Sequence, residues 1–448
     1  MKNRFKYFGI ATFIFVLFLG ISSCKDAQDL KTKLSKIRDT EITAIEPDSL
    51  YTESYDVRFL QPIDHNNPDI GHFKQRVIVN HIGFDRPTVV ILEGYDLSST
   101  KAGELSKMLN ANQITIEHRF YGESQPDSLP WDLLNVKQAA ADQHKIIKSL
   151  KKIYPGKWIS TGISKGGQTT IFHRRFYPDD VDVSVPYVAP LNLEREDRRI
   201  AEHFATVGTK ECRDKILNFQ KALFENKEHI LPFVKKHAQE KNYKFKNLGI
   251  ERAYDINVLE YLFAFWQWSG NCEIIPQENA TFEEMFNHWI SISPFSFFEV
   301  EPLSSDQLFS YQALTELGFY DYDISPFTKY LDDTANITFD FKIPEEVYYS
   351  YNPSIMKDIN NWVQNNGNYM LYIHGEYDPW GATGVKPSDN TIAVTMINPK
   401  GNHGTRIKSF PKDMQTNIYQ LLESWLDITI NDTIQSGGGF ANEVLEIL

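Results

Sequence analysis

Trp158-Ile159-Ser160-Thr161-Gly162-Ile163-Ser164-Lys165-Gly166-Gly167 is the stretch that decides the fold. It begins as an aromatic and β-branched run, breaks at a glycine, presents one serine and continues into residues 168–176, which favour helix. G-x-S-x-G at a strand–turn–helix junction is the pattern of a nucleophile elbow, where small residues on both sides of the serine permit a sharp turn. A tight turn with a buried serine is the alternative.

The regions before the elbow alternate between strand and helix patterns. Short runs of alternating or continuous apolar residues predict strands, and longer amphipathic runs predict helices. Because strands that alternate with helices form parallel sheets, the core is expected to be a mostly parallel sheet. The predicted strands are 55–59, 73–82, 87–92 and 113–117, and the predicted helices are 102–110 and 142–154.

The alternation continues after the elbow but is interrupted by a long helical and aromatic region. A strand over 181–188 carries Pro186, which suits the end of a strand better than its middle. The interruption then predicts a lid with helices at 201–208, 214–236, 258–268 and 282–290, and the sheet resumes with a helix at 353–365, strands at 369–373 and 391–397, and a helix at 411–426. The predicted fold class is an α/β-hydrolase fold with a mostly parallel central sheet and an inserted helical lid.

These patterns divide the chain into six parts. The predicted segments are a signal peptide with a lipobox-like end at 1–24, a tether at 25–50, a first core part at 51–194, a helical lid at 195–345, a second core part at 346–430 and a C-terminal tail at 431–448.

Asp378 and His403 complete a candidate triad with Ser164. A serine hydroxyl becomes a good nucleophile when a histidine takes its proton and an acid fixes that histidine. In this fold class the chain order is serine, acid, histidine, each on a loop after a strand. Asp378 follows the strand 369–373 and His403 follows the strand 391–397. Taken singly, Asp378 is also a typical turn residue before proline and His403 a loop histidine; the order and settings of all three favour catalysis.

Two backbone groups are candidates for an oxyanion hole. The loop after the third strand and the residue after the nucleophile supply these N–H groups in the fold class. They correspond here to the backbone around Gly94 and Tyr95 and to Lys165.

The N-terminus predicts export. Lys2, Arg4 and Lys6 precede an apolar run over 8–21, which has the length of a signal peptide rather than a membrane span. The run ends in Ile21-Ser22-Ser23-Cys24, which resembles a bacterial lipoprotein cleavage site and predicts lipidation of Cys24. A cleaved secretory signal with a spectator cysteine is the alternative. Both place the protein outside the cytoplasm, either in a bacterial envelope or secreted, with any membrane contact made through the lipid.

Composition restricts the partners. The net charge of −13 provides no basic stripe for nucleic acid. The sequence contains no zinc-ligand spacing, Walker lysine or dinucleotide glycine motif, so we expect no metal and no cofactor. The remaining cysteines, Cys212 and Cys272, are a disulfide candidate in an oxidising compartment, with two free thiols as the alternative. Nothing in the sequence sets the oligomeric state.

The sequence resembles a family of peptidases. The segments 61–65 and 73–76, Glu93-Gly94, the run Glu117-His118-Arg119-Phe120-Tyr121-Gly122-Glu123-Ser124 and the elbow together look like two related serine-peptidase families. One contains prolyl carboxypeptidase and related dipeptidyl peptidases, and the other is the secreted bacterial tripeptidyl-aminopeptidase family of PS-10 type. Lys165 and the stretches 142–167, 207–212 and 263–268 resemble the bacterial family more closely.

The resemblance implies an exopeptidase that acts on peptides with a free N-terminus through Ser164, Asp378 and His403. It also implies that Glu93, beside Gly94, holds the substrate ammonium; a carboxylate bonded to backbone in its own loop is the alternative. The lid aromatics Phe263, Phe265, Trp266 and Trp268 either line a pocket for an apolar or prolyl side chain, with Trp266 touching substrate, or form ordinary core.

Other functions on the same scaffold stay open. A prolyl-type dipeptidyl peptidase or carboxypeptidase and a lipase or esterase use the same triad. A non-catalytic binding lipoprotein is the rival from another class, and an intact triad argues against it.

Overall fold

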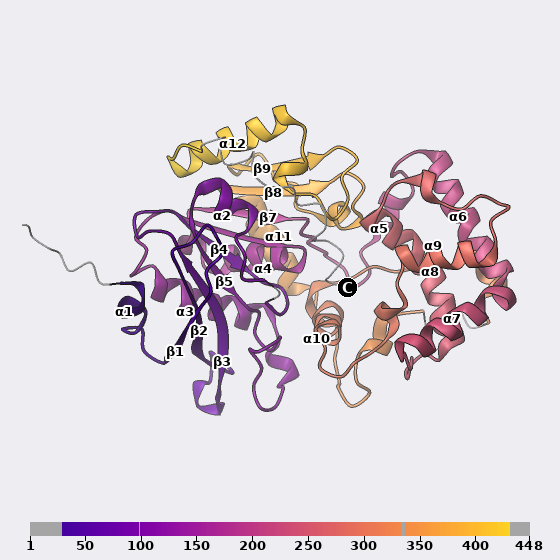
Figure 1. The fold of residues 1–448 in the computed structure, drawn as a ribbon, viewed down its shortest axis with the longest axis horizontal. Helices are drawn as coiled ribbons and strands as arrows, with labels where there is room; N and C mark the ends of the chain where they lie inside the picture. Colours follow the sequence, from indigo (N-terminus) through magenta and orange to yellow (C-terminus); the bar gives the residue numbers. More distant parts are fainter. Residues whose placement is uncertain (1–28, 98, 333–336, 431–448) are drawn as a thin grey trace, which may run out of the picture.

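The computed structural model describes residues 29–97, 99–332 and 337–430. Within them nine strands form one sheet in the order β1-β2-β3-β5-β4-β6-β7-β8-β9 (Figure 1). The first four strands in this order pair antiparallel, and the pairs from β5 onward are parallel. The strands are β1 (Thr40–Ile45), β2 (Glu53–Pro62), β3 (His72–His81), β4 (Thr88–Leu92), β5 (Asn112–Ile116), β6 (Trp158–Ile163), β7 (Val183–Tyr187), β8 (Met370–Gly375) and β9 (Ala393–Asn398).

Helices cover both faces of this sheet because the central strands are apolar on both sides. Successive residues of β4 illustrate the alternation: Val89 packs with α2 and α12, whereas Val90 and Leu92 pack with α3. On the same face of the sheet as α3, helices α4 and α11 pack together against β8. The helices of this part are α1 (Leu30–Leu34), α2 (Glu104–Leu109), α3 (Val136–Leu150), α4 (Lys165–Phe176), α11 (Ser354–Asn366) and α12 (Lys412–Leu426).

The strand order reverses next to β4. The chain passes from β4 to β5 on one side and returns to β6 on the other. In open parallel sheets such a switch point creates a crevice at the carboxyl ends of the strands, where ligands bind. Here it lies between the loop that follows β4 and the serine that follows β6. A mostly parallel sheet with this order and a serine elbow at its switch point is an α/β-hydrolase fold.

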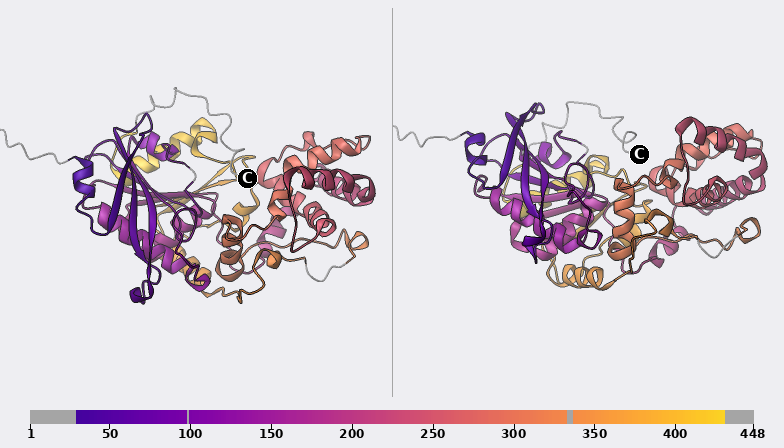
Figure 2. Two further views of the ribbon diagram at one scale, coloured as in Figure 1. Left: turned by 60° about the horizontal axis from the view of Figure 1, so that its bottom comes forward. Right: turned by 90° about the horizontal axis from the view of Figure 1, so that it is seen from below.

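The lid is a separate group of helices beside the carboxyl ends of the strands (Figures 1 and 2). The apolar side chains of α6 to α9 form a core of their own, which centres on α8. The lid helices are α5 (Arg198–Phe204), α6 (Lys210–Glu225), α7 (Lys227–Lys241), α8 (Ile250–Trp268), α9 (Phe282–Ile292) and α10 (Ser305–Gln312). The single helix predicted over 214–236 is wrong, because the chain breaks at Asn226 into α6 and α7.

The prediction of a tether over 25–50 is wrong from residue 30 onward, where α1 and then β1 belong to the fold. Leu30 and Leu34 of α1 are buried beside α3, and β1 adds an edge strand to β2. The side chains of β1 are mostly exposed or half-buried, so its sequence resembles a polar linker. The edge of the sheet therefore begins within the stretch predicted as linker.

Pro186 lies inside β7 and not at its end. The pairs of β7 with β8 are Ser184 with Met370 and Tyr187 with Ile373, so the ladder skips the proline. A residue without an N–H is tolerated where the ladder has this gap.

Several sequence predictions lie outside the described residues. These are the signal segment 1–24 with Cys24 and the tail 431–448. No helix in the described part of the chain has the length and apolar character needed to span a bilayer.

Candidate active site

Ser164 occupies a strained turn between β6 and α4. Its φ of 56° and ψ of −119° lie in a region that non-glycine residues rarely adopt, and such strain is frequent at active sites. The turn requires small neighbours: a Cβ on Gly162 would lie 2.2 Å from the Gly166 carbonyl oxygen, and one on Gly166 would lie 2.8 Å from the Leu92 carbonyl oxygen. The Ser164 N–H donates to the Tyr187 carbonyl at 2.9 Å. The serine is therefore held at the end of the strand, as the elbow pattern predicts.

Asp378 and His403 meet at the carboxyl ends of β8 and β9. The Asp378 Oδ2 atom lies 2.8 Å from His403 Nδ1, and its Oδ1 accepts the Trp380 N–H at 3.1 Å. The Asp378 side chain is fully buried. A carboxylate at Nδ1 leaves Nε2 of the ring available as a base.

No hydrogen bond between Ser164 and His403 occurs among the described residues. Hydrogen bonds of this kind often form only when the substrate is bound, so the arrangement remains compatible with a serine–histidine pair.

The lid holds the loop that carries His403. The backbone N–H of His403 donates to the Gln267 carbonyl at 2.9 Å, and the Asn402 side-chain amide donates to the Trp268 carbonyl at 2.8 Å. The Trp268 ring meets the His403 ring edge to face, with centroids 5.4 Å apart. The last turn of α8 thus positions the predicted base.

The loop that follows β4, called here the Glu93 loop (residues 93–97), packs directly on the elbow. A Cβ on Gly94 would lie 2.6 Å from the Gly166 nitrogen and from the Lys165 carbonyl carbon. The N–H groups of Tyr95 and Lys165 have no hydrogen-bond acceptor among the described residues. Two unpaired N–H groups beside a serine are the donors that an oxyanion requires.

Glu117 explains much of the motif at 117–124. Its carboxylate accepts hydrogen bonds from the Leu97 N–H at 2.9 Å, the Glu123 N–H at 3.0 Å and the Ser124 hydroxyl at 2.6 Å. The next residue, His118, donates its N–H to the Tyr95 carbonyl at 3.1 Å. This motif therefore fixes the Glu93 loop through hydrogen bonds to Leu97 and Tyr95.

Glu93 lies at the start of that loop, and its side chain is half-buried. Burial raises the pKa of its carboxyl to about 7, with the nearby charges of Asp96 and Glu117 contributing in the same direction. Among the described residues, none donates a hydrogen bond to the Glu93 carboxylate and none forms an ion pair with it. The structure therefore does not contain the alternative arrangement, in which the Glu93 carboxylate accepts hydrogen bonds from the backbone of its own loop.

The four aromatic residues named from α8 separate into different environments. Trp266 is 1% exposed and packs with Phe265 in the lid core and with Tyr377, so it presents almost no surface to a ligand. Phe263 stacks on Tyr320 and contacts Trp380, close to the Asp378 turn. Trp268 is the one that contacts His403.

Cys212 and Cys272 form a disulfide, with their Cα atoms 5.6 Å apart. It ties the first turn of α6 to the segment just after α8. No group of histidine, cysteine and acidic residues in the described ranges is arranged to hold a metal ion.

Three contacts of the site are not evident from the sequence: the hydrogen bond from Asn402 to the Trp268 carbonyl at the end of α8, the hydrogen bond from the Leu97 N–H in the Glu93 loop to Glu117, and the hydrogen bond from the Lys165 side chain to the Gly94 carbonyl. Glu117 had a signal in the resemblance motif, but no local pattern shows what Asn402 contacts.

Several known proteins are similar to this chain. The model of a family described as PS-10 peptidase S37 matches residues 23–436. A prolyl tri/tetrapeptidyl aminopeptidase of Streptomyces mobaraensis is 30% identical over 411 residues, which are 89% of this chain and 85% of the relative. A lysosomal Pro-X carboxypeptidase of Bos taurus is 29% identical over 162 residues, 31% of this chain and 32% of the relative. Among solved structures, the proline iminopeptidase of Mycobacterium smegmatis aligns with a TM-score of 0.42 and 11% identity, covering 82% of this chain and 98% of that one.

Proposed function

The chain belongs to the PS-10 peptidase S37 family, and from that premise we propose that this serine peptidase is an exopeptidase that releases short peptides, most simply tripeptides, from a free N-terminus. The name of the Streptomyces relative supports the cleavage of three or four residues. The observation that carries the proposal for this chain is the Glu93 carboxylate, which lacks a partner next to the predicted oxyanion hole.

In the proposed reaction Ser164 attacks the scissile carbonyl while His403 takes its proton. Asp378 fixes the ring and stabilises the imidazolium that forms. The N–H groups of Tyr95 and Lys165 hold the oxyanion, the histidine returns the proton to the leaving amine, and water then releases the peptide from the acyl-enzyme.

Glu93 gives the site its preference for a free N-terminus. An unpaired, half-buried carboxylate favours a cationic partner, and a substrate ammonium would provide a charge-assisted hydrogen bond. Asp96 and Glu117 lie near enough to raise the pKa of Glu93, and they add to the negative potential at this end of the crevice.

The residue whose carbonyl is attacked would contact apolar surface. Ile163, directly before the serine, is 46% exposed, which is unusual for a large aliphatic side chain at the end of a central strand. A proline ring fits such a surface, and the Streptomyces relative is named as prolyl. We include a proline preference in the proposal.

We further propose that the enzyme works outside the cytoplasm, anchored by a lipid on Cys24. The lipobox-like sequence supports the anchor, and the Cys212–Cys272 disulfide is typical of an oxidising compartment. The Cys24→Ser substitution should move the protein from the membrane fraction to the soluble fraction, which fractionation of cells that express the variant would measure. An unchanged distribution would rule out the lipid anchor.

The activity is tested with di-, tri- and tetrapeptide amides, each with a free or acetylated N-terminus and with proline or alanine before the scissile bond. We expect turnover of the free tripeptide series with proline preferred, and none with Ser164→Ala. Removal of the last residue from acetylated peptides with a free C-terminal carboxylate, assayed beside the amides, would instead indicate a carboxypeptidase. Hydrolysis of short-chain esters without peptide turnover would indicate an esterase.

A further inference from the structure

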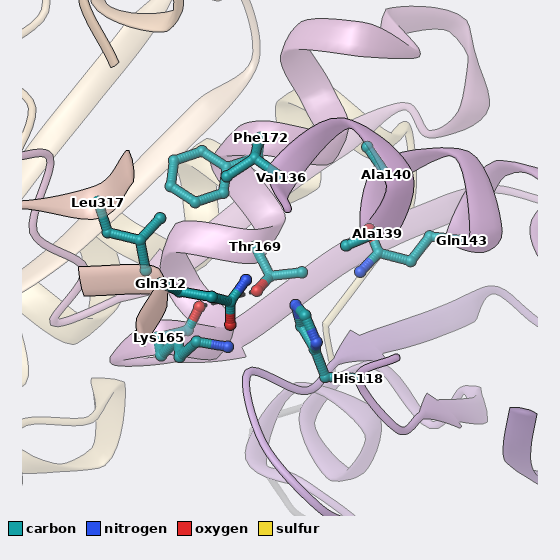
Figure 3. A pocket seen from close by; sticks show the side chains of 10 residues that line it. All are labelled: His118, Val136, Ala139, Ala140, Gln143, Lys165, Thr169, Phe172, Gln312 and Leu317. Atoms are coloured by element: carbon teal, nitrogen blue, oxygen red, sulfur yellow. Dashed lines mark hydrogen bonds between the residues drawn. The ribbon is translucent and has the colours of Figure 1, made fainter. Parts of the chain in front are cut away.

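Lys165 has a buried side chain in addition to the N–H that it contributes to the site. The residue is 3% exposed, and its chain runs back from the elbow into a small cavity between α3, α4 and α10. Figure 3 shows the amine turned toward His118, with Gln312 beside it. The side chain therefore lies behind the serine, away from the crevice.

The Lys165 amine holds one particular oxygen. Its Nζ donates a hydrogen bond to the carbonyl of Gly94. In a trans peptide the carbonyl and the following N–H point in opposite directions, and the described residues contain no cis peptide. A Gly94 carbonyl held toward the cavity therefore directs the Tyr95 N–H toward the crevice.

Packing alone does not account for a lysine here. No carboxylate in the described parts of the chain pairs with it, and the amine lies 4.5 Å from the Tyr121 ring centroid and 5.2 Å from that of Tyr95. Burial lowers the pKa of this amine well below its usual range. A buried polar group without a full set of partners is costly, whereas methionine would fill the same space without that penalty.

We propose that the Lys165 side chain is a positioning residue of the oxyanion hole, which holds the Gly94 carbonyl so that the Tyr95 N–H faces the oxygen of the tetrahedral intermediate. The residue after the nucleophile thus provides one donor with its backbone and orients the other with its side chain. The amine donates this hydrogen bond in both of its protonation states. The inference rests on the proposed role of Ser164.

Lys165→Met tests it, because methionine keeps the backbone donor and much of the volume but cannot bond Gly94. Removal of one oxyanion donor lowers kcat by about 10²–10³-fold in serine peptidases, and we expect a loss of about 10²-fold with KM changed less than threefold. The rate of labelling by a fluorophosphonate, whose phosphoryl oxygen occupies the oxyanion hole, should fall with kcat. Thermal stability should be equal to or above that of the parent protein, because a buried amine with only one hydrogen-bond partner has been removed.

Lys227→Met is the control from outside the site. Lys227 lies 5.4 Å from the Tyr254 ring centroid, so it shares an aromatic contact with Lys165, but it is paired with Asp255 at 2.6 Å, is partly exposed and lies on the lid far from the elbow in sequence. We expect unchanged kcat and labelling, with stability equal to or below that of the parent.

A kcat for Lys165→Met within threefold of the parent would overturn the proposal, as would a loss that appears wholly in KM. Lys165→Leu gives a second measurement, and failure of both variants to fold would assign the amine a structural role and also overturn it. Failure of the proposed function is seen separately: the parent enzyme would then leave the peptides intact, or Ser164→Ala would retain turnover. If the parent cleaves only esters, the kcat comparison is made on the ester.

Discussion

Reduction of the Cys212–Cys272 disulfide should destabilise the lid and, through the lid, inactivate the enzyme on heating. The bond closes a loop of 60 residues. In the chain-entropy account a loop of that length stabilises the folded state by about 4 kcal/mol. Because the lid has its own apolar core, the loss should fall on lid unfolding first.

The effect on activity follows from the contacts at the end of α8. Gln267 and Trp268 hold the His403 loop, and the disulfide lies just beyond them at Cys272. Gly270, in between, packs so closely on Tyr377 that a Cβ would lie 2.6 Å from that ring. Melting of the lid therefore releases the predicted base before the sheet unfolds.

The assay compares the parent protein, with and without reductant, and a Cys212→Ser/Cys272→Ser variant. A loss of about 4 kcal/mol corresponds to a fall of about 8–16 °C in the midpoint for a unit of 150–250 residues. We expect that fall in the temperature at which activity is lost, together with earlier proteolysis of the lid and kcat at 25 °C within twofold. The double variant should not respond to reductant. Equal midpoints with and without the disulfide would refute the argument, and a large loss of kcat at 25 °C would show that the bond acts on the site directly.

Three further predictions concern the site itself. Asp378→Asn should lower kcat by about 10⁴-fold, because an amide fails to hold the His403 tautomer that can act as a base; an intact circular dichroism spectrum is the control, and retained turnover would remove Asp378 from the triad. With a pKa raised to about 7, the Glu93 carboxylate loses its charge as the pH falls through 7; kcat/KM for free N-termini should drop there, while hydrolysis of an uncharged ester loses less, and Glu93→Gln should abolish that difference. Gly94→Ala should lower the free energy of unfolding and raise the activation free energy behind kcat by about 1–3 kcal/mol each, because the new Cβ would lie 2.6 Å from the Gly166 nitrogen and backbone atoms cannot easily move away. Unchanged kinetics would mean that the loop is not part of the site.

The framework of the site could be predicted because its determinants are local. Ser164, Asp378 and His403 each follow a strand whose apolar run is visible in the sequence, and parallel strands bring their carboxyl ends to one edge. The elbow could be predicted from the spacing of Gly162 and Gly166, which lie two residues before and two residues after Ser164. None of these inferences required knowledge of a distant contact.

The features that were missed depend on distant contacts or on weak patterns. The break at Asn226 interrupts a continuous helical pattern without proline or glycine at the break. Trp266 and Trp268 are close in sequence, but residues that are two positions apart in a helix point to nearly opposite sides. One therefore enters the lid core and the other faces His403, and the sequence does not say which.

The lid is more than a cover over the crevice. The sheet fixes where each side chain of the predicted triad leaves its strand, but the His403 loop takes its final position from the carbonyls of Gln267 and Trp268. The Glu93 loop is likewise tied to the lid, since Asp96 accepts a hydrogen bond from Ser305 at 2.6 Å. A lid that only screened substrates would change KM when loosened. Because this lid contacts both the His403 loop and the Glu93 loop, changes at the end of α8 should appear mainly in kcat.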